Sequence, residues 1–348
     1  MQTLWFWLTS IMIVAYATMD GFDFGAGILH PFVAKTDRER REVLAAIGPF
    51  WDGNEVWLIA GGGTMFVAFP KVLAAGFSGL YLAMFLVLWT LLLRGIAIEF
   101  RSHVKLDLWR SFWDAVFFLA STALPIFLGA ALGNVIRGVP VDAQGQFNLP
   151  LFTGFAPTNP VGILDWFTVL VGLFVFVTLV AHGALFLSYK TDGTVRRRCR
   201  KVALPLWSTA AGLSVLATIA TARVNPRIYT NLATAPLAWL GLALFLAGMA
   251  AVFVAQPKGR DGIALLGSSA FIVGILVATA ATVFPVMLRS TLDPAWSLTA
   301  FNASVSHYAL VSAAKWWFLG FPLAVGYFIV VFRLHRGRVS APDDGEGY

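Results

Sequence analysis

Long apolar segments constrain this chain more than any other feature of its sequence. Runs of roughly 18 or more apolar residues are typical of membrane-spanning segments, and the bilayer favours helices because backbone polar groups need internal partners there. Only 12% of the 348 residues are charged, about half the share of a soluble domain. We therefore predict an all-α, polytopic integral membrane protein with about nine transmembrane helices. The predicted helices cover residues 4–32, 47–69, 72–100, 109–136, 161–189, 202–222, 237–255, 263–288 and 305–332.

The basic residues are concentrated in every second loop. Nineteen of the 25 Lys and Arg residues lie in or beside the odd-numbered loops and the tail, five lie in the other loops, and Lys315 lies inside the last predicted helix. Because short basic loops stay in the cytoplasm, we expect the N-terminus outside and the C-terminus inside. Residues 1–338 then form one transmembrane helical domain, and residues 339–348 form a polar cytoplasmic tail.

Four smaller features of the sequence add to this prediction. No Lys or Arg precedes the first apolar run, unlike a cleavable signal peptide, so we expect that run to be retained as a helix. The capping-box spacing of Thr36 and Glu39 predicts a short interfacial helix before the second span. The net charge of +7 comes from short loops without interleaved aromatic residues, which argues against nucleic-acid binding. A single cysteine, Cys199, excludes an internal disulfide and a cysteine-ligated metal site.

The most informative residues are ionisable ones inside the predicted spans. A charge near the bilayer centre costs at least about 2.5 kcal/mol, so such residues indicate function or pairing. Because the first three spans alternate in direction, we expect these residues to share one cytoplasm-facing layer. They are Asp20 and Asp23 in MDGFDFGAG, Asp52 and Glu55 in WDGNEVW, and Arg94 and Glu99 in LRGIAIEFR, with Arg101 just beyond.

This group of residues has two interpretations. Buried carboxyl groups can pass protons inward from the cytoplasm, with Asp20, Asp23, Asp52 and Glu99 as the proton pathway. Alternatively, the acids pair with Arg94 and serve structure alone. The glycines of the first two spans, Gly61, Gly62 and Gly63 among them, indicate close helix packing.

Haem or metal ligation is not expected in this chain. His182 lies deep in the fifth predicted span, but no second residue offers a paired axial ligand. We therefore predict no catalytic residue and no metal ligand.

The motifs just quoted resemble subunit II of cytochrome bd-type quinol oxidases. The match is most specific in DGFDFGAG, IGPFWDGNEVWLIAGGGTMFVAFP and LRGIAIEFR, and it returns near the C-terminus in STLDPAWSLTAFNAS. The first 101 residues carry most of it, whereas residues 140–260 resemble the family mainly in their pattern of spans.

The resemblance implies a place in the bacterial cytoplasmic membrane and in a respiratory quinol:dioxygen oxidoreductase. Haems b and d would lie in the partner, subunit I, while this haem-free chain would pack against it. The acids of the family's proton route would be Asp20 or Asp23, Asp52, and Glu99 where the family also uses Asp. Glu55, Arg94 and Arg101 would form supporting ion pairs. The resemblance leaves open whether a structural quinone binds to this chain and whether a small single-span subunit joins the complex. Membrane lipids are expected neighbours.

Two alternatives to a proton-conducting subunit stay in view. A stand-alone proton-coupled secondary transporter could use the same acids, but the sequence shows no inverted repeat of the kind such proteins often have. A purely structural scaffold subunit would contain the same ion pairs without moving protons.

Overall fold

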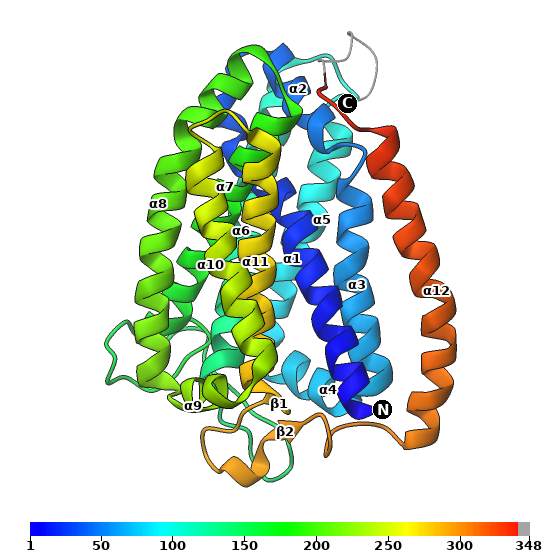
Figure 1. Cartoon of the computed structure of the whole chain (residues 1–348), viewed down its shortest axis with the longest axis vertical. Coiled ribbons are helices and arrows are strands. Elements are labelled where there is room, and N and C mark those ends of the chain that lie inside the picture. Colours follow the sequence, from blue (N-terminus) through cyan, green and yellow to red (C-terminus); the bar gives the residue numbers. More distant parts are fainter. Residues whose placement is uncertain (340–348) are drawn as a thin grey trace.

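Helix α1 (Gln2–Val33) runs through the interior of a helical bundle in this computed structural model, which describes residues 1–339 (Figure 1). It packs against α3 (Trp51–Ala68), α6 (Asp107–Arg137), α7 (Trp166–Lys190) and α11 (Asp261–Val283). The most apolar 18-residue stretches of α1 and α7 are 61% and 72% buried, the largest shares among the membrane-length helices. These two helices therefore form the centre of the bundle.

The remaining long helices surround that centre. Helix α5 (Tyr81–Phe100) packs on α6, α8 (Gly193–Val224) on α7, and α10 (Pro236–Ala255) on α11. Helix α12 (His307–Leu334) stands at the edge beside α3 (Figure 1). Within residues 1–339, eight helices are long and apolar enough to cross a membrane, or nine if the bent pair α3 and α4 forms one crossing. The prediction of a polytopic all-α membrane protein is confirmed.

The predicted span at 72–100 is divided in the structure, and that prediction was wrong in its first part. Helix α4 (Pro70–Gly79) leaves α3 at a bend of 118° and ends before α5 begins at Tyr81. Pro70 is the first residue of α4. A helix needs no N–H donor at this position, but a proline cannot continue the preceding helix α3. The third crossing is therefore α5 alone.

Several predicted boundaries also shift, and short elements appear that the sequence analysis did not predict. Helix α7 begins at Trp166 rather than 161, α8 begins at Gly193, which places Cys199 inside a helix, and α11 ends at Val283. The short elements are α9 (Arg227–Thr234), strand β1 (Val286–Leu288), the 3₁₀ turn η1 (Pro294–Trp296) and strand β2 (Leu298–Thr299), with β1 and β2 antiparallel.

The predicted short helix before the second span is confirmed as α2 (Asp37–Ile47), and its position at the membrane interface stays a prediction. The Thr36 hydroxyl accepts a hydrogen bond from the Glu39 N–H at 3.2 Å, and the Glu39 carboxylate accepts one from the Thr36 N–H at 3.3 Å. The apolar face of α2, including Leu44 and Ile47, is buried against the bundle. This reciprocal cap fixes where α2 begins and which face it turns inward.

The two ends of the bundle differ in charge. The loops at 34–36, 101–106, 191–192 and 256–260 lie at the same end as α2 and the end of α12, whereas the N-terminus and the β1–β2 hairpin lie at the other (Figure 1). We call these the α2 end and the hairpin end. The basic loops thus share one end, and its placement in the cytoplasm stays a prediction. Of the predicted tail 339–348, residues 340–348 lie outside the described part of the chain.

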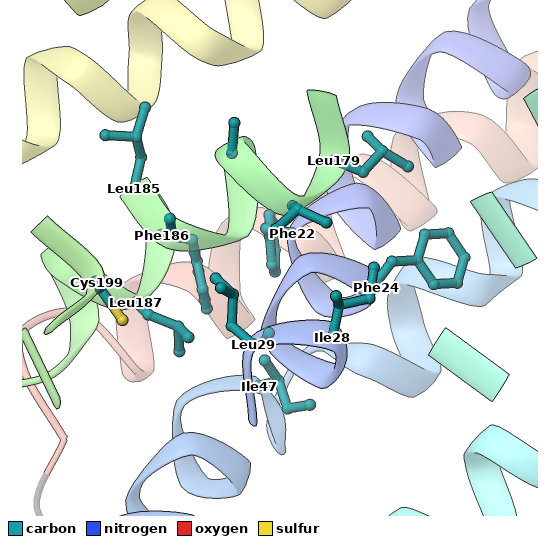
Figure 2. Packing of buried hydrophobic residues seen from close by; sticks show 14 of the residues in the cluster. Phe22, Phe24, Ile28, Leu29, Ile47, Leu179, Leu185, Phe186, Leu187 and Cys199 are labelled. Carbon is teal, nitrogen blue, oxygen red and sulfur yellow. The ribbon is translucent and has the colours of Figure 1, made fainter. Parts of the chain in front are cut away.

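Helices α1 and α7 come into backbone contact at Gly25 and Gly183. A methyl group on Gly183 would lie 2.5 Å from Gly25 Cα, and one on Gly25 would lie 2.7 Å from Gly183 Cα. One turn away along α1, the rings of Phe22 and Phe186 stack with centroids 4.0 Å apart (Figure 2). Small residues therefore do allow close packing here. The same expectation was wrong for Gly62 and Gly63, because a methyl group on either would meet nothing within 4 Å in the described chain.

We expect Gly183→Ala to destabilise the protein by about 1–3 kcal/mol, because the added methyl meets the α1 backbone, which cannot rotate away as a side chain could. Thermal unfolding of the purified protein measures this, with Gly62→Ala as the matched control because its methyl would enter open space. An equal change in the two variants would contradict the proposed backbone contact.

Candidate functional site: a buried charge cluster on α1

A fully buried arginine organises a cluster between α1, α3 and α5. Arg94 of α5 is 0% exposed, and its Nη2 lies 2.7 Å from Asp20 Oδ1 and 2.5 Å from Glu55 Oε1. The guanidinium also lies over the Phe24 ring, 4.4 Å from its centroid. Because an unpaired charge in this environment is strongly unfavourable, the two carboxylates explain how Arg94 is accommodated.

A second buried acid lies one turn along α1. Asn54 Nδ2 donates a hydrogen bond to Asp23 Oδ2 at 2.8 Å and also contacts the Met19 carbonyl at 3.2 Å. The other oxygens of both side chains, Asp23 Oδ1 and Asn54 Oδ1, have no hydrogen-bond partner within residues 1–339. Asp23 and Asp20 are three residues apart and therefore share one face of α1. Asp23 is thus a buried carboxyl group with one oxygen still available.

The cluster reaches the protein surface through one side chain. Asp20 and Arg94 have fully buried side chains, whereas the side chain of Glu55 is 23% exposed. The neighbouring surface of α3 is apolar, with Val56 and Ile59 exposed. The charge cluster therefore reaches the lateral surface of the bundle at Glu55.

The structure divides the predicted acids into two groups. Asp20, Asp23 and Glu55 come together around Arg94, as the shared-layer prediction requires. Asp52 in the first turn of α3 and Glu99 near the end of α5 are exposed. These two acids lie nearer the α2 end than the cluster does.

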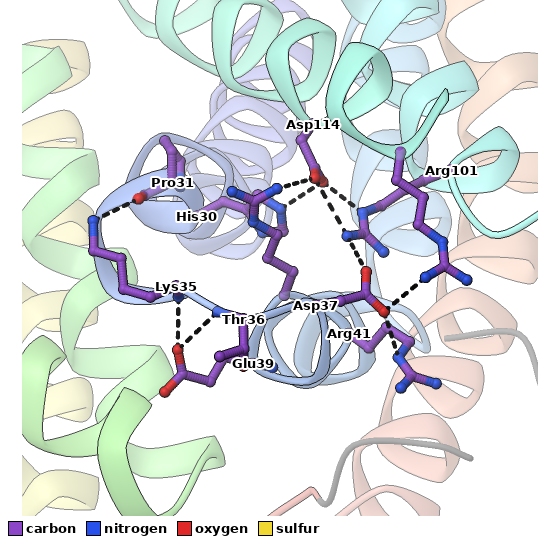
Figure 3. A network of polar contacts seen from close by, with 11 residues as sticks. His30, Pro31, Lys35, Thr36, Asp37, Glu39, Arg41, Arg101 and Asp114 are labelled. Atoms are coloured by element: carbon purple, nitrogen blue, oxygen red, sulfur yellow. Dashed lines mark hydrogen bonds and ion pairs between the residues drawn. The ribbon is translucent and has the colours of Figure 1, made fainter. Parts of the chain in front are cut away.

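A second charged network, which the sequence analysis missed, surrounds Asp114 at the α2 end (Figure 3). Its carboxylate accepts hydrogen bonds from His30 Nε2 at 2.8 Å, Arg101 Nε at 2.5 Å and Arg40 Nη1 at 2.7 Å. Arg101 thus forms its ion pairs here and not with the acids named from the sequence. The signal was present, since Asp114 is an ionisable residue within the predicted span 109–136.

The same network also holds helix α2 against the bundle through ion pairs. Asp37 accepts from Arg101 at 2.8 Å and from Arg110 at 3.1 Å. On the other side, Arg198 of α8 donates to Glu39 at 2.8 Å. Partial desolvation opposes ionisation of Glu39, but the Lys35 N–H and Arg198 outweigh it and lower the pKa of that carboxyl below its usual value. Charged contacts therefore hold α2 on both flanks.

The deeply buried His182 has no nitrogen left for a metal. Its Nδ1 lies 2.7 Å from Ser268 Oγ, and its Nε2 lies 3.0 Å from the Thr18 carbonyl, which can only accept. No group of three His, Cys, Asp or Glu residues in positions 1–339 is arranged to hold a metal ion. His182 instead joins α1, α7 and α11.

Comparisons with known proteins agree along the whole chain. Residues 1–335 match the family model described as cytochrome bd terminal oxidase subunit II. The cytochrome bd ubiquinol oxidase subunit 2 of Bacillus subtilis (strain 168) is 33% identical over 345 residues, which are 98% of this chain and 97% of that protein. The cytochrome bd-I ubiquinol oxidase subunit 2 of Escherichia coli (strain K12) is 38% identical over 205 residues, or 58% and 52% of the two chains.

A solved structure shares the fold. The bd oxidase from Geobacillus thermodenitrificans matches with a TM-score of 0.74 and 19% identity, covering 96% of this chain and 98% of that one.

We expect Asp114→Asn to destabilise the protein by about 3–5 kcal/mol, because Arg101 would keep its buried charge while losing the main carboxylate beside it. Asp192→Asn is the matched control, since the Asp192–Arg338 pair is exposed on both sides and such pairs contribute little. Thermal unfolding of the two variants would show the difference, and an unchanged midpoint in Asp114→Asn would contradict the role assigned to this network.

Proposed function

The chain belongs to the cytochrome bd terminal oxidase subunit II family, and we propose that its buried carboxyl groups carry protons from the cytoplasm into the oxidase. As subunit II of a cytochrome bd quinol oxidase, it works in respiratory electron transport. In this proposal the α2 end faces the cytoplasm, as the basic loops predict. The protons are consumed when dioxygen is reduced to water in the complex.

One observation supports the proposal above others: Asp23 is buried, close to an ion-paired carboxylate, and has a free oxygen. Arg94 forms direct ion pairs with Asp20 and Glu55, because each lies within 2.7 Å of its Nη2. Asp23 has an amide donor instead of a direct arginine contact. It can therefore gain and lose a proton with the smallest disturbance of the ion pairs.

The exposed acids extend the proposed route. Asp52 precedes Glu55 by three residues on α3 and so shares its helical face. Glu99 lies five residues beyond Arg94, toward the α2 end of α5. We assign both to the outer part of the proton pathway, and Glu55 and Arg94 to the ion pairs that hold its geometry. Arg101, which was expected to join them, pairs with Asp114 and Asp37 instead.

The proposal gives catalysis to the partner. Haems b and d and the oxygen chemistry belong to subunit I, and this chain alone is not catalytic. The side of α3 that opens at Glu55 is apolar and exposed, with Val56 and Ile59, which suits burial against another membrane protein. A transporter working alone is disfavoured by family membership, whereas a scaffold without proton traffic is separated from the proposal by experiment.

We expect Asp23→Asn, measured in the purified two-subunit complex, to slow quinol oxidase turnover on the order of 100-fold while the haem spectrum stays intact. The amide retains the shape and the contact with Asn54 but cannot carry a proton. Asp52→Asn should lower turnover as well, by a smaller factor because water reaches that position. Asp107→Asn, an exposed acid at the same end, is the control and should be unaffected.

The haem spectrum separates the competing roles. Wild-type turnover in Asp23→Asn would rule out proton transfer through this residue. Loss of the haem spectrum in the same variant would show instead that the cluster serves assembly, as a scaffold subunit requires.

A further inference from the structure

Three polar residues and one glycine form a stripe along one face of α1. Asp20, Asp23, Gly27 and His30 follow one another at spacings of three and four residues, so they lie on the same side of the helix. All four are buried. From Asp20 to His30 the stripe rises about 15 Å along the helix axis. It therefore joins the buried charge cluster to the Asp114 network at the α2 end.

His30 ends the stripe with one nitrogen satisfied and one free. Its Nε2 lies 2.8 Å from Asp114 Oδ1, and the same carboxylate accepts from Arg101 and Arg40. A carboxylate surrounded by two guanidinium groups stays charged, so Nε2 carries the hydrogen and Nδ1 carries the lone pair. That lone pair has no hydrogen-bond partner within residues 1–339, although His30 is 0% exposed.

A second free polar atom lies midway along the stripe. Ser121 of α6 is fully buried, and its hydroxyl has no hydrogen-bond partner in the described chain. It lies directly against Gly27, because a methyl group on Gly27 would overlap Ser121 Oγ and lie 3.0 Å from Phe117 Cζ. The Phe117 ring in turn packs edge-on against His30, with centroids 5.6 Å apart. Glycine at this position leaves room for the hydroxyl between His30 and Asp23.

His30 Nδ1, Ser121 Oγ and Asp23 Oδ1 are all buried polar atoms without a hydrogen-bond partner in residues 1–339. Buried polar groups are nearly always hydrogen-bonded, and internal water supplies the partner where protein does not. Here His30 Nδ1, Ser121 Oγ and Asp23 Oδ1 follow one another along about 10 Å of helix. A hydroxyl and a few water molecules span such a distance with ordinary hydrogen bonds.

We propose that His30 and Ser121 form the leg of the proton route that leads from the α2 end to Asp23. This inference rests on the proposed function. His30 Nδ1 accepts a proton from water, while Nε2–H keeps its bond to Asp114, which holds the ring. The proton then leaves Nδ1 through the Ser121 hydroxyl and water to Asp23 Oδ1. Arg40 and Arg101, on the far side of Asp114, oppose a lasting positive charge on His30, so the proton is passed on.

The test measures proton uptake and electron transfer separately in the purified oxidase, by following a pH indicator and the haem absorbance after oxygen is admitted to the reduced complex. His30→Gln keeps an N–H donor for Asp114 but cannot bind a proton, so proton uptake should slow about 100-fold with the haem spectrum unchanged. His335→Gln, the same change at an exposed histidine of the α2 end, is the control and should take up protons at the wild-type rate.

Ser121→Ala provides a second variant that removes only the hydroxyl, and it should slow uptake about tenfold. If His30→Gln does not assemble, Ser121→Ala decides. Wild-type uptake in His30→Gln, or in Ser121→Ala when only that variant assembles, would overturn the inference. The proposed function fails separately, through wild-type uptake in Asp23→Asn. Slow uptake in Asp23→Asn with wild-type uptake in the other two would place the route elsewhere on the way to the same acid.

Discussion

The charge of Arg94 is the constraint on which the centre of this structure depends. A guanidinium enclosed among apolar helices must be balanced nearby, and the balance comes from Asp20 on α1 and Glu55 on α3. One side chain of α5 thereby joins three helices. Arg94 pairs with Asp20 and Glu55, whereas the printed side-chain partner of Asp23 is the Asn54 amide, so Asp23 is the acid whose protonation disturbs these ion pairs least. The cluster is thus both a structural joint and a candidate proton carrier, with the two roles on different residues.

The network around Asp114 differs from the Arg94 cluster, because here a carboxylate is surrounded by hydrogen-bond donors. Its carboxylate is saturated by donors from three other helices or helix ends, so it can hold position but has no free lone pair to exchange protons. His30 belongs to both systems, since it lies on the α1 stripe with one ring nitrogen held by Asp114, while the other has no hydrogen-bond partner within residues 1–339. A membrane protein can use the same residue types as rigid anchors or as carriers, and the number of donors on each carboxylate distinguishes the two.

Much of this architecture could be predicted from the sequence, because long apolar runs and basic loops report directly on the bilayer. The bend between α3 and α4 could not, since hydropathy does not register the 118° change of direction at Pro70. Spacing placed Asp20 and Asp23 together correctly, but Asp52 and Glu55 share that spacing and one is exposed while the other pairs with Arg94. Which helix faces touch depends on packing between residues 31 or more positions apart. Asp114 was missed because its partners come from three separate segments.

The contacts of α2 determine when this helix can dock during biosynthesis. Arg40 meets Asp114, 74 residues further along the chain, and Glu39 meets Arg198, 159 residues further. A ribosome delivers these partners long after α2 has emerged, so the short helix must wait at the membrane surface until α6 and the start of α8 have been inserted. Its final docking therefore marks the completion of the first two-thirds of the bundle during biosynthesis.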